Sequence, residues 1–468
     1  MKAPSAERAP SPGPATDLEH LAGEALAIDA RSLPDAIRRQ ACLCVLDTVG
    51  CIVAGARTGE AALMLACEPP SADGTALRIP GLRETRPLRP ALRIAGYLGD
   101  VLELNDLIGG HASIGNVTLA LALGQELDAP GGKVLEAVVR GIEVTARVYA
   151  SVYPTLKRFS SVGMMPVGLP AAIGSAAVAA HLLDLDRERT GHAMAIAGAL
   201  SGWCPAEVIF GEGGSVKPML FGAQTAQAGL DGALYARAGM TGPMRLLESK
   251  VGYFATASRA GRYAREDWAG RWALAEPRRK LHACCGYIHA PIDLLSRMRA
   301  DDPTRLAGAS VEVRVAPYVA EVVAKDRLPV SPNDARFHLQ YCLAHVLAGV
   351  DVFLPEHSIG MDAHLRDPAL AAAMARISVT ADERLSHYHQ CEIAVRGAST
   401  GSSAASSTRA LSSPRGTPRN PLSDQEVVDK FLRLSAPVVG DAAAGRFAER
   451  TMALQAEAGA RDWIGLLG

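Results

Sequence analysis

The stretch DAIRRQACLCVLDTVGCIVAG, residues 35–55, indicates the kind of fold that this chain adopts. Apolar residues recur in it at the intervals that bring side chains onto one face of an α-helix, and Gly55 is suited to end that helix. The residues on this face are Ile37, Ala41, Cys44, Val45, Val49 and Ile52. Similar stretches follow, with Gly or Pro between them: ALRIAGYLGDVLEL (91–104), VTLALALGQEL (117–127) and KVLEAVVRGIEVTARVYASVY (133–153). The residues from about 17 to 275 are therefore predicted to form a large all-helical domain.

Small residues are frequent inside two later stretches of this predicted domain. They are Ala171, Ala172, Gly174, Ala176, Ala177, Ala179 and Ala180, and then Ala193, Ala195, Ala197, Gly198 and Ala199. The distance between packed helices depends on the side chains at their contact, so small ones allow a close approach. We expect these two helices to lie in the centre of the domain.

One segment, from Phe159 to Leu183, contains no Asp, Glu, Lys or Arg and is long enough to span a bilayer. It also contains Pro166, Pro170, several glycines and His181, and its apolar residues are mostly Ala and Val. This composition predicts a loop that leads into a buried Ala-rich helix, and no membrane partner.

The composition excludes several other classes of protein. The 468 residues carry 48 Lys+Arg and 49 Asp+Glu, a formal charge of -1, which gives no reason to expect nucleic acid as a partner. The nine cysteines are an odd number without a repeated CxxC spacing, which favours reduced thiols in a cytoplasmic protein. Residues 1–16 have no apolar core of a signal peptide and are predicted to be a disordered leader.

The sequence changes character after Pro277. SVEVRVAPYV (310–319) and HQCEIAVRG (389–397) alternate with the period of a β-strand. ARFHLQYCLAHVLAGV (335–350) and DPALAAAMARI (367–377), which lie between them, have the spacing of helices. We therefore predict a smaller α+β domain over residues 276–422, which includes a Ser-rich loop or hairpin tip at 399–420.

The last residues, 423–468, are predicted to form helices that return to the helical domain. Their first helix starts with Ser423 and has Glu426 three residues later, which is the spacing of a capping box.

General motifs of catalysis and phosphate binding are missing from the sequence. No GxGxxG follows a strand, and GxxxxGK[ST], GxSxG and HExxH do not occur. GEGGS (211–215) precedes Lys217 but lacks the remaining residues of a phosphate-binding loop.

Polar residues in apolar surroundings form three candidate segments. In the first, Glu103, Asn105 and Asp106 are followed by two glycines and His111. Two acids and an imidazole on one loop suit proton transfer at a carbon acid. The alternative is an ordinary helix end with surface carboxylates and a capping histidine.

The second candidate is Lys217, at the start of an Ala- and Gly-rich helix, where a lysine adds to the positive potential of the helix N-terminus and suits a carboxylate ligand. A surface lysine is the alternative.

The third candidate is a segment of cations, thiols and imidazoles at the predicted domain junction. Its members are Arg278, Arg279, Lys280, His282, Cys284, Cys285, Tyr287 and His289. Standard metal-ligand spacing is absent and nothing indicates a lowered thiol pKa, so an anion-binding junction is favoured over a metal site or Cys–His catalysis.

Seven segments, taken in order, resemble the MmgE/PrpD family, which includes 2-methylcitrate dehydratase and cis-aconitate decarboxylase. They are CLCVLDTVGCIVAGA (42–56), LELNDLIGGHAS (102–113), VVRGIEVTARV (138–148), SVKPMLFGAQTAQAGLDGALYARAGMTGP (215–243), KLHACCGYIHAPIDLL (280–295), ARFHLQYCLAHVLAGV (335–350) and GTPRNPLSDQEVVDKF (416–431). The resemblance implies a mainly α fold with an α+β lid, usually a homodimer, and a cofactor-free and metal-free site between the two domains.

The resemblance also implies roles for individual residues. Glu103, Asp106 and His111 match the acids and the histidine of the family's active-site loop. Lys217 and Lys280 match its two lysines, which are expected to be unpaired cations that hold substrate carboxylates, while His111 moves a proton at the α-carbon. The positions that match polar residues of the lid motifs are Cys284 or Cys285, His289 and Tyr341.

The chain departs from the family pattern at several positions. Met165 replaces a histidine, Leu220 stands where another histidine is common, Asn105 replaces an acid, and His338 replaces a serine. These changes predict a more apolar pocket with less capacity for proton transfer. Catalysis is assigned to Glu103, Asp106, His111, Lys217, Lys280 and Tyr341, and substrate binding to Asn105, Met165, Cys284, Cys285, His289 and His338.

The function expected from the resemblance is that of a lyase, a dehydratase or decarboxylase of small di- or tricarboxylates related to methylcitrate or aconitate. An isomerase or epimerase that uses the same proton transfer, and a member of the family without catalysis, remain alternatives.

Overall fold

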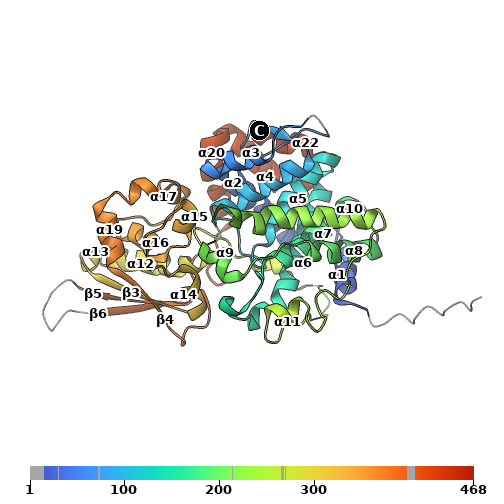
Figure 1. Cartoon of the computed structure of the whole chain (residues 1–468). Helices are drawn as coiled ribbons and strands as arrows, with labels where there is room; N and C mark the ends of the chain where they lie inside the picture. The colour runs from blue at the N-terminus through green and yellow to red at the C-terminus, as the bar shows by residue number, and fades with distance from the viewer. Residues whose placement is uncertain are drawn as a thin grey trace, which may run out of the picture.

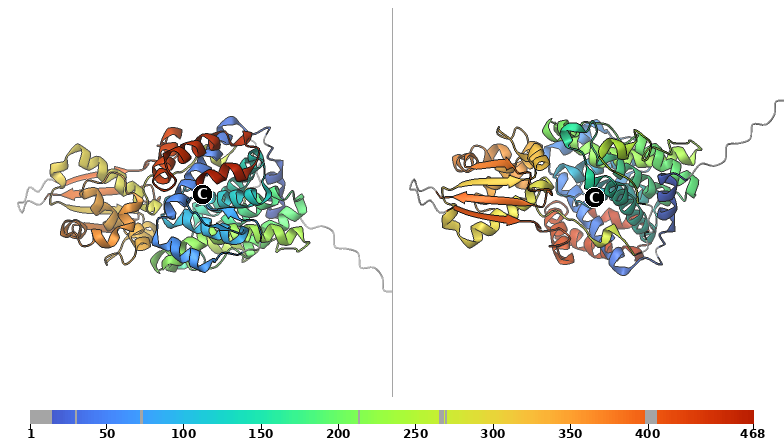
Figure 2. Two further views of the ribbon diagram at one scale, coloured as in Figure 1. Left: turned by 90° about the horizontal axis from the view of Figure 1, so that it is seen from above. Right: turned by 90° about the horizontal axis from the view of Figure 1, so that it is seen from below.

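The computed structural model describes residues 15–29, 31–71, 74–212, 214–264, 268, 270–397 and 406–468. Two bodies lie side by side in every view (Figures 1 and 2). We call the larger one, which contains α1–α11 and α20–α22, the helical body, and the smaller one, which contains β3–β6 and α12–α19, the lid. The predicted fold class, mainly α with an α+β lid, is confirmed.

In the described residues, the first part of the helical body contains eleven α-helices. They are α1 (Asp17–Ala27), α2 (Asp35–Gly55), α3 (Gly59–Cys67), α4 (Leu88–Val101), α5 (Ala112–Leu127), α6 (Gly131–Ala150), α7 (Gly168–Leu182), α8 (Arg187–Ala199), α9 (Ala206–Glu212), α10 (Gln224–Arg237) and α11 (Tyr253–Ala257). The helix predicted over residues 35–55 is confirmed, with Gly55 as its last residue. A short antiparallel pair, β1 (Leu77–Arg78) and β2 (Thr85–Arg86), interrupts the helices and was not predicted.

Helix α7 lies in the centre of the helical body, packed against α5, α6, α8 and α10. Its glycine and alanine residues are buried, which agrees with the prediction for residues 159–183. At Gly174 an added Cβ would lie 2.0 Å from the Thr145 hydroxyl and 2.4 Å from the Gly141 carbonyl, both on α6. At Gly229 of α10 it would lie 2.4 Å from Ser175 of α7. The three helices therefore approach one another at distances that only glycine allows.

The lid contains one four-stranded sheet in the order β4–β3–β5–β6. Its strands are β3 (Ser310–Val315), β4 (Ile377–Ala381), β5 (Cys391–Arg396) and β6 (Ser406–Leu411). β3 pairs parallel with β4 and antiparallel with β5, which pairs antiparallel with β6. Its helices are α12 (His289–Asp301), α13 (Pro303–Leu306), α14 (Pro317–Val323), α15 (Pro332–Arg336), α16 (Leu339–Leu347), α17 (Pro355–Ile359), α18 (Met361–His364) and α19 (Pro368–Ala375). Figure 1 shows α12, α16 and α19 together on one side of the sheet.

The strands and helices predicted for the lid need three corrections. The strand predicted over 310–319 ends at Val315, because Pro317 has no backbone N–H for the ladder and starts α14 instead. The helix predicted over 335–350 is two helices, since His338 caps the second one by accepting a hydrogen bond from the backbone N–H of Tyr341 (3.2 Å). Strand β4 directly follows α19 and was not predicted.

The Ser-rich segment predicted as a loop or hairpin tip is only partly described. Residues 398–405 lie outside the described residues, as do residues 1–14 of the predicted leader. The remainder of the segment includes β6, which pairs antiparallel with β5, so this part is a strand of a hairpin rather than a loop or the tip alone.

The C-terminal helices pack on the helical body, α20 (Asp424–Val439) against α2 and α22 (Ala460–Ile464) against α5, with α21 (Asp441–Met452) between them. The predicted capping box is present, because the Ser423 hydroxyl accepts from the Glu426 backbone N–H while the Glu426 carboxylate accepts from the Ser423 backbone N–H. The domain boundaries at 275/276 and 422/423 stay predictions.

Among the helices that the structure describes, none alone is long and apolar enough to cross a membrane. The pair α2 and α3 meets the length and composition criterion only when taken together across a 90° bend.

Candidate active site

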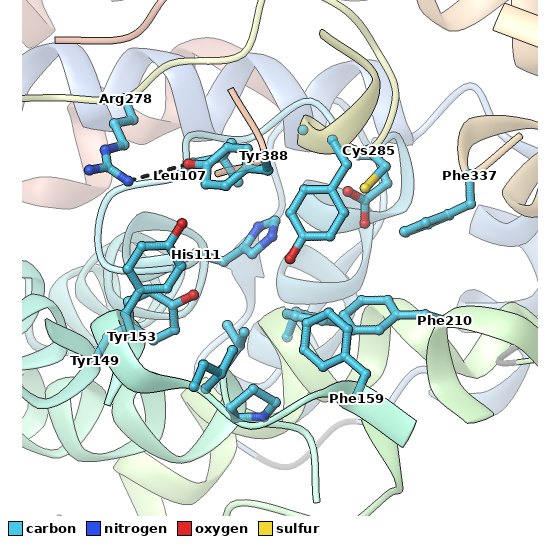
Figure 3. Close-up of a pocket in the computed structure, with 18 of the residues that line it drawn as sticks. Leu107, His111, Tyr149, Tyr153, Phe159, Phe210, Arg278, Cys285, Phe337 and Tyr388 are labelled. Carbon is cyan, nitrogen blue, oxygen red and sulfur yellow. Dashed lines mark hydrogen bonds between the residues drawn. The ribbon is translucent and has the colours of Figure 1, made fainter. Parts of the chain in front are cut away.

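A cavity lies where the helical body meets the lid, and aromatic side chains dominate its wall (Figure 3). Its empty volume is about 690 Å³, with solvent at the mouth included. The residues that line it are Glu103, Leu107, Gly110, His111, Tyr149, Tyr153, Leu156, Phe159, Pro166, Val167, Phe210, Lys217, Phe221, Arg278, Cys285, Gly286, Tyr287, Phe337 and Tyr388. Four predicted site residues are among them: Glu103, His111, Lys217 and Cys285.

The loop of residues 102–111 connects α4 to α5 and brings His111 to the cavity. Gly109 has a φ of 52°, and a Cβ on it would lie 2.6 Å from the Ala146 Cα of α6. Only glycine combines this left-handed backbone with so close an approach. Glu103 also has a positive φ, of 53°, which is uncommon for a residue with a side chain. Its carbonyl and its carboxylate both accept hydrogen bonds from the Lys280 ammonium group, at 2.9 and 2.8 Å.

A chain of hydrogen bonds from Asp100 through Asn105 determines which nitrogen of His111 is protonated. The Asn105 amide nitrogen donates to the Asp100 carboxylate at 2.7 Å, so the Asn105 oxygen faces His111 Nδ1, also at 2.7 Å. An amide oxygen accepts only, and Nδ1 therefore carries the proton while Nε2 keeps its lone pair. Among the described residues, Nε2 has no hydrogen-bond partner. Burial and the nearby Lys280 lower the pKa of His111 to about 3 despite Asp100, so the ring is neutral at pH 7.

Lys217 and Lys280 are both paired with carboxylates of the protein, although the sequence suggested unpaired cations. Lys217 donates to Asp100 at 3.1 Å and forms an ion pair with Glu103. Lys280 bonds the other oxygen of Glu103 at 2.8 Å. All four side chains are almost fully buried. Burial lowers the pKa of Lys217 to about 8 and also lowers that of Lys280. At Asp100 burial acts to raise the pKa, but Lys217, His111, Lys280 and the Asn105 hydrogen bond together outweigh it, and the pKa is lowered.

Lys217 reaches the cavity from an irregular part of the chain. It precedes the π-helical turn Met219–Ala223, which leads into α10. Such turns are rare and frequent at functional sites. The turn places Phe221 under the ammonium group, whose nitrogen lies 4.3 Å from the ring centre of Phe221 and 5.2 Å from that of Phe337. The same ring lies 5.1 Å from the ring of His111.

Lys430 of α20 fixes the chain segments that carry these residues. Its ammonium group donates to the carbonyls of Leu104 (2.7 Å) and Lys280 (2.9 Å), and it pairs with Asp47 of α2 at 2.6 Å. In addition, the Leu107 backbone N–H donates to the Arg278 carbonyl at 2.7 Å. The loop and the junction segment are therefore held against each other from behind.

Asp106 lies behind the loop rather than on the cavity wall. It accepts hydrogen bonds from the Ser113 hydroxyl and, at 3.3 Å, from the Ile108 backbone N–H. Burial and the neighbouring Asp47 raise its pKa to about 6. Asp106 contacts neither His111 nor either lysine through a hydrogen bond.

The two cysteines of the junction differ in their position. Cys285 lines the cavity, and burial raises its pKa to about 11, so it is a thiol at pH 7. Cys284 is fully buried in the lid core, away from the cavity, and burial raises its pKa as well.

The three other candidates of the lid do not line the cavity. His338 caps α16 and its Nε2 lies 2.6 Å from the Arg327 carbonyl. The Tyr341 hydroxyl donates to the His357 carbonyl at 2.6 Å, deep in the lid. The ring of His289 lies 4.9 Å from that of His282.

Met165 packs in a small apolar cluster with Val167, Ile209 and Phe221, next to Leu220. Met165 itself is behind the wall of the cavity, which Pro166 and Val167 form at this point. The two substituted histidine positions thus belong to one apolar patch beside Phe221.

Several residues of the site were not predicted, on the cavity wall and, at Asp100, behind it. Asp100 has a signal in the sequence, as an acid one helical turn before Glu103 at the end of a predicted helix. The aromatic residues have none, because their spacing fits an ordinary core. They are Tyr149, Tyr153, Phe159, Phe210, Phe221, Phe337 and Tyr388. Arg278 was noted only as one of three adjacent cations; Arg279 instead reaches α2, where it donates to the Gln40 carbonyl at 3.4 Å.

In the part of the chain that the structure describes, no group of three or more His, Cys, Asp and Glu side chains is arranged to hold a metal ion.

Comparisons with known proteins match both halves of the chain. The model of the MmgE/PrpD N-terminal domain matches residues 19–266, and that of the MmgE/PrpD C-terminal domain matches residues 282–455. The cis-aconitate decarboxylase-like protein oryM of Aspergillus oryzae is 26% identical over 360 residues, 71% of this chain and 70% of that protein. Cis-aconitate decarboxylase of Aspergillus terreus is 24% identical over 246 residues, which are 49% of this chain and 50% of that enzyme. The two domain matches show that the chain belongs to the MmgE/PrpD family.

Proposed function

We propose that this protein is a lyase that removes a proton next to the carboxylate of a small acid, with His111 as the base. The observation that carries the proposal is the neutral His111 ring, which lines the cavity while Asn105 holds its Nδ1 and leaves the lone pair on Nε2. A general base must have its lone pair within reach of the substrate and be unprotonated at the working pH. His111 lines the cavity and is neutral at pH 7, which supports this role.

The first step moves the α-proton of the acid to Nε2, and the electron pair of the broken C–H bond forms a carbon–carbon double bond. The hydroxyl group on the next carbon leaves as water. It takes a proton from the Lys217 ammonium group, which is charged at pH 7 because its pKa is about 8. Asp100, whose Oδ1 lies 3.9 Å from His111 Nδ1, stabilises the imidazolium. The proton on His111 then returns to Lys217 through solvent, and both groups are restored.

Decarboxylation is the second candidate, and the names of the two fungal relatives favour it. In that reaction the carbon–carbon bond to the carboxylate breaks, and the carbon that keeps the electron pair must receive a proton. The neutral His111 offers the cavity a lone pair and no proton. Lys217 is a donor on the cavity wall. Dehydration is therefore our leading assignment, and decarboxylation requires Lys217 alone as the acid.

Other predictions from the sequence are carried forward as parts of this proposal. They are activity without a cofactor, a homodimer and a cytoplasmic location, whereas the di- or tricarboxylate substrate that the resemblance implies is not favoured by the charges of the site. The pairing of Lys217 and Lys280 with Glu103 and Asp100 bears on the substrate, because these cations are already neutralised.

The proposal is tested by incubating the protein in D2O with citrate-, methylcitrate-, aconitate- and malate-type acids and with their apolar-chain 3-hydroxy analogues, followed by NMR. Loss of water or of CO2 supports a lyase and separates the two reactions. Deuterium uptake without net loss indicates an isomerase. The His111→Ala variant is the control for the base, and a chelator is expected to leave the rate unchanged. Inertness of the whole panel would overturn the proposed chemistry.

A further inference from the structure

Arg278 differs from the other cations of the site because no carboxylate of the described chain pairs with it. It lines the cavity, is half-buried, and donates one hydrogen bond, at 3.3 Å, to the Tyr388 hydroxyl oxygen. The Tyr388 hydroxyl hydrogen is thereby left to donate to another group. A guanidinium and a phenol hydrogen that face the same space are donors of the kind that bind a carboxylate.

The charges of the site determine how many carboxylates it can take. Lys217 and Lys280 face Asp100 and Glu103, so these four groups sum to zero, and His111 is neutral. Arg278 adds a single positive charge. A bound monocarboxylate would neutralise it, whereas each further carboxylate would enter a largely apolar space without a partner. Burying an unpaired charge costs much more than any gain from apolar contact.

The aromatic rings on the two sides of the cavity differ: rings with a hydroxyl group accompany Arg278 on one side, and phenylalanine rings lie on the other, where Lys217 Nζ, 5.2 Å from the Phe337 ring centre, is already paired with Glu103. In Figure 3, Arg278, Tyr388, Tyr149 and Tyr153 lie on one side of His111, and Phe159, Phe210 and Phe337 lie on the other. The ring of Phe210 lies 5.2 Å from Phe159 and 6.1 Å from Phe337, so the three form a continuous aromatic surface.

We infer that this cavity takes an acid with one carboxylate and an apolar body, and that Arg278 and Tyr388 bind the carboxylate. The apolar body lies along the phenylalanine surface, and the carbon between the two ends faces His111. The inference rests on the proposed use of the cavity for a carboxylate substrate, and it assigns to Arg278 the role that the sequence gave to Lys217 and Lys280.

Calorimetric titration of the full chain at pH 7 tests this assignment without requiring turnover. The probes are 3-phenylpropionate, its uncharged analogue 3-phenylpropionamide, and citrate. We expect 3-phenylpropionate to bind at least about tenfold more tightly than the amide and than citrate, as a charge-assisted hydrogen bond predicts.

Variants of the two donors locate the binding site. Arg278→Met is expected to weaken 3-phenylpropionate by about tenfold or more and to leave the amide unchanged. Arg278→Lys keeps the charge but loses the planar set of guanidinium N–H donors, and should weaken the binding of 3-phenylpropionate by about threefold. Tyr388→Phe should have a similar effect. Arg259→Met, which removes an exposed arginine outside the cavity, is the matched control and should change nothing.

The inference is overturned if citrate binds more tightly than 3-phenylpropionate, or if Arg278→Met and Arg278→Lys both bind 3-phenylpropionate like the parent chain. If Arg278→Met does not fold, the order of the three probes on the parent chain and the Tyr388→Phe result decide. The two proposals fail independently. If only the lyase proposal is wrong, no acid of the NMR panel reacts, but 3-phenylpropionate still binds more tightly than its amide and citrate.

Discussion

Burial lowers the pKa of both His111 and His345 to about 3, yet the first is only partly buried, the second is buried, and they lie in very different places. His111 lines the cavity and is oriented by Asn105. His345 lies in the lid core, where its ring is 4.9 Å from His364 and 5.5 Å from Phe353, and its Nε2 is buried without a hydrogen-bond partner in the described chain. A shifted pKa thus identifies burial, while access and a fixed tautomer distinguish a candidate base from a core histidine.

The strongest test of this difference compares two truncations. His111→Ala is expected to lower the turnover of a responsive acid by about 10²- to 10⁴-fold, the usual contribution of a general base. His345→Ala should leave turnover within about threefold, and lower the free energy of unfolding by about 2–4 kcal/mol through the cavity it creates. Initial rates and chemical denaturation measure both. Similar losses of turnover in the two variants would remove the distinction.

Substitution of Asn105 is expected to lower turnover less than loss of His111, and to act on kcat rather than on KM. Asn105→Leu removes the acceptor of the Nδ1 proton, so His111 can carry its proton on either nitrogen, and we expect kcat to fall by about 10- to 100-fold with little change in KM. Asn105→Asp keeps an acceptor for Nδ1 and should recover part of the loss. Steady-state kinetics of both variants decide, and an increase in KM alone would point to substrate binding by Asn105 instead.

The pH dependence of turnover should reflect the lowered pKa values of Lys217 and His111 rather than those of a solvent-exposed lysine and histidine. The Lys217 pKa of about 8 means that its ammonium group donates below pH 8, so turnover should fall about tenfold per pH unit above that value. The His111 pKa of about 3 means that its lone pair is available throughout the range above pH 4. A profile of kcat/KM from pH 4.5 to 9.5 is expected to show the alkaline limb only. An acidic limb near pH 6.5 would mean that His111 is solvated like a free histidine.

The smallest expected effect concerns Tyr341, which the sequence grouped with the catalytic residues. Its hydroxyl bonds the His357 carbonyl within the lid, so Tyr341→Phe should lower the free energy of unfolding by about 1 kcal/mol and leave turnover unchanged. Thermal unfolding and initial rates check this. A clear loss of turnover at unchanged stability would instead mean that the Tyr341 hydroxyl takes part in catalysis.

The sequence predicted the parts of the fold that depend on local pattern. The limits of α2, the burial of α7 and the capping box at Ser423 follow from apolar spacing, small residues and cap chemistry, all of which are local. Strand β4 was missed because its five residues directly follow a helix and gain their stability from pairing with β3, far away in sequence.

The sequence allowed several residues of the candidate site to be predicted, but not the groups with which they pair. His111, Lys217, Glu103 and Cys285 were among the candidates, and all four line the cavity. The pairing of Lys217 with Asp100 joins residues 117 positions apart, so no local pattern contains it. Likewise, the sequence does not tell which of three adjacent cations turns toward the cavity.

Lys430 has a consequence for the order in which the protein can become active. It holds the carbonyls of Leu104 and Lys280 from a helix that follows the lid in the chain. During synthesis, every candidate catalytic residue leaves the ribosome before α20 does. A nascent chain that stops short of α20 therefore contains every candidate residue without the support that aligns them, and α20 completes the site.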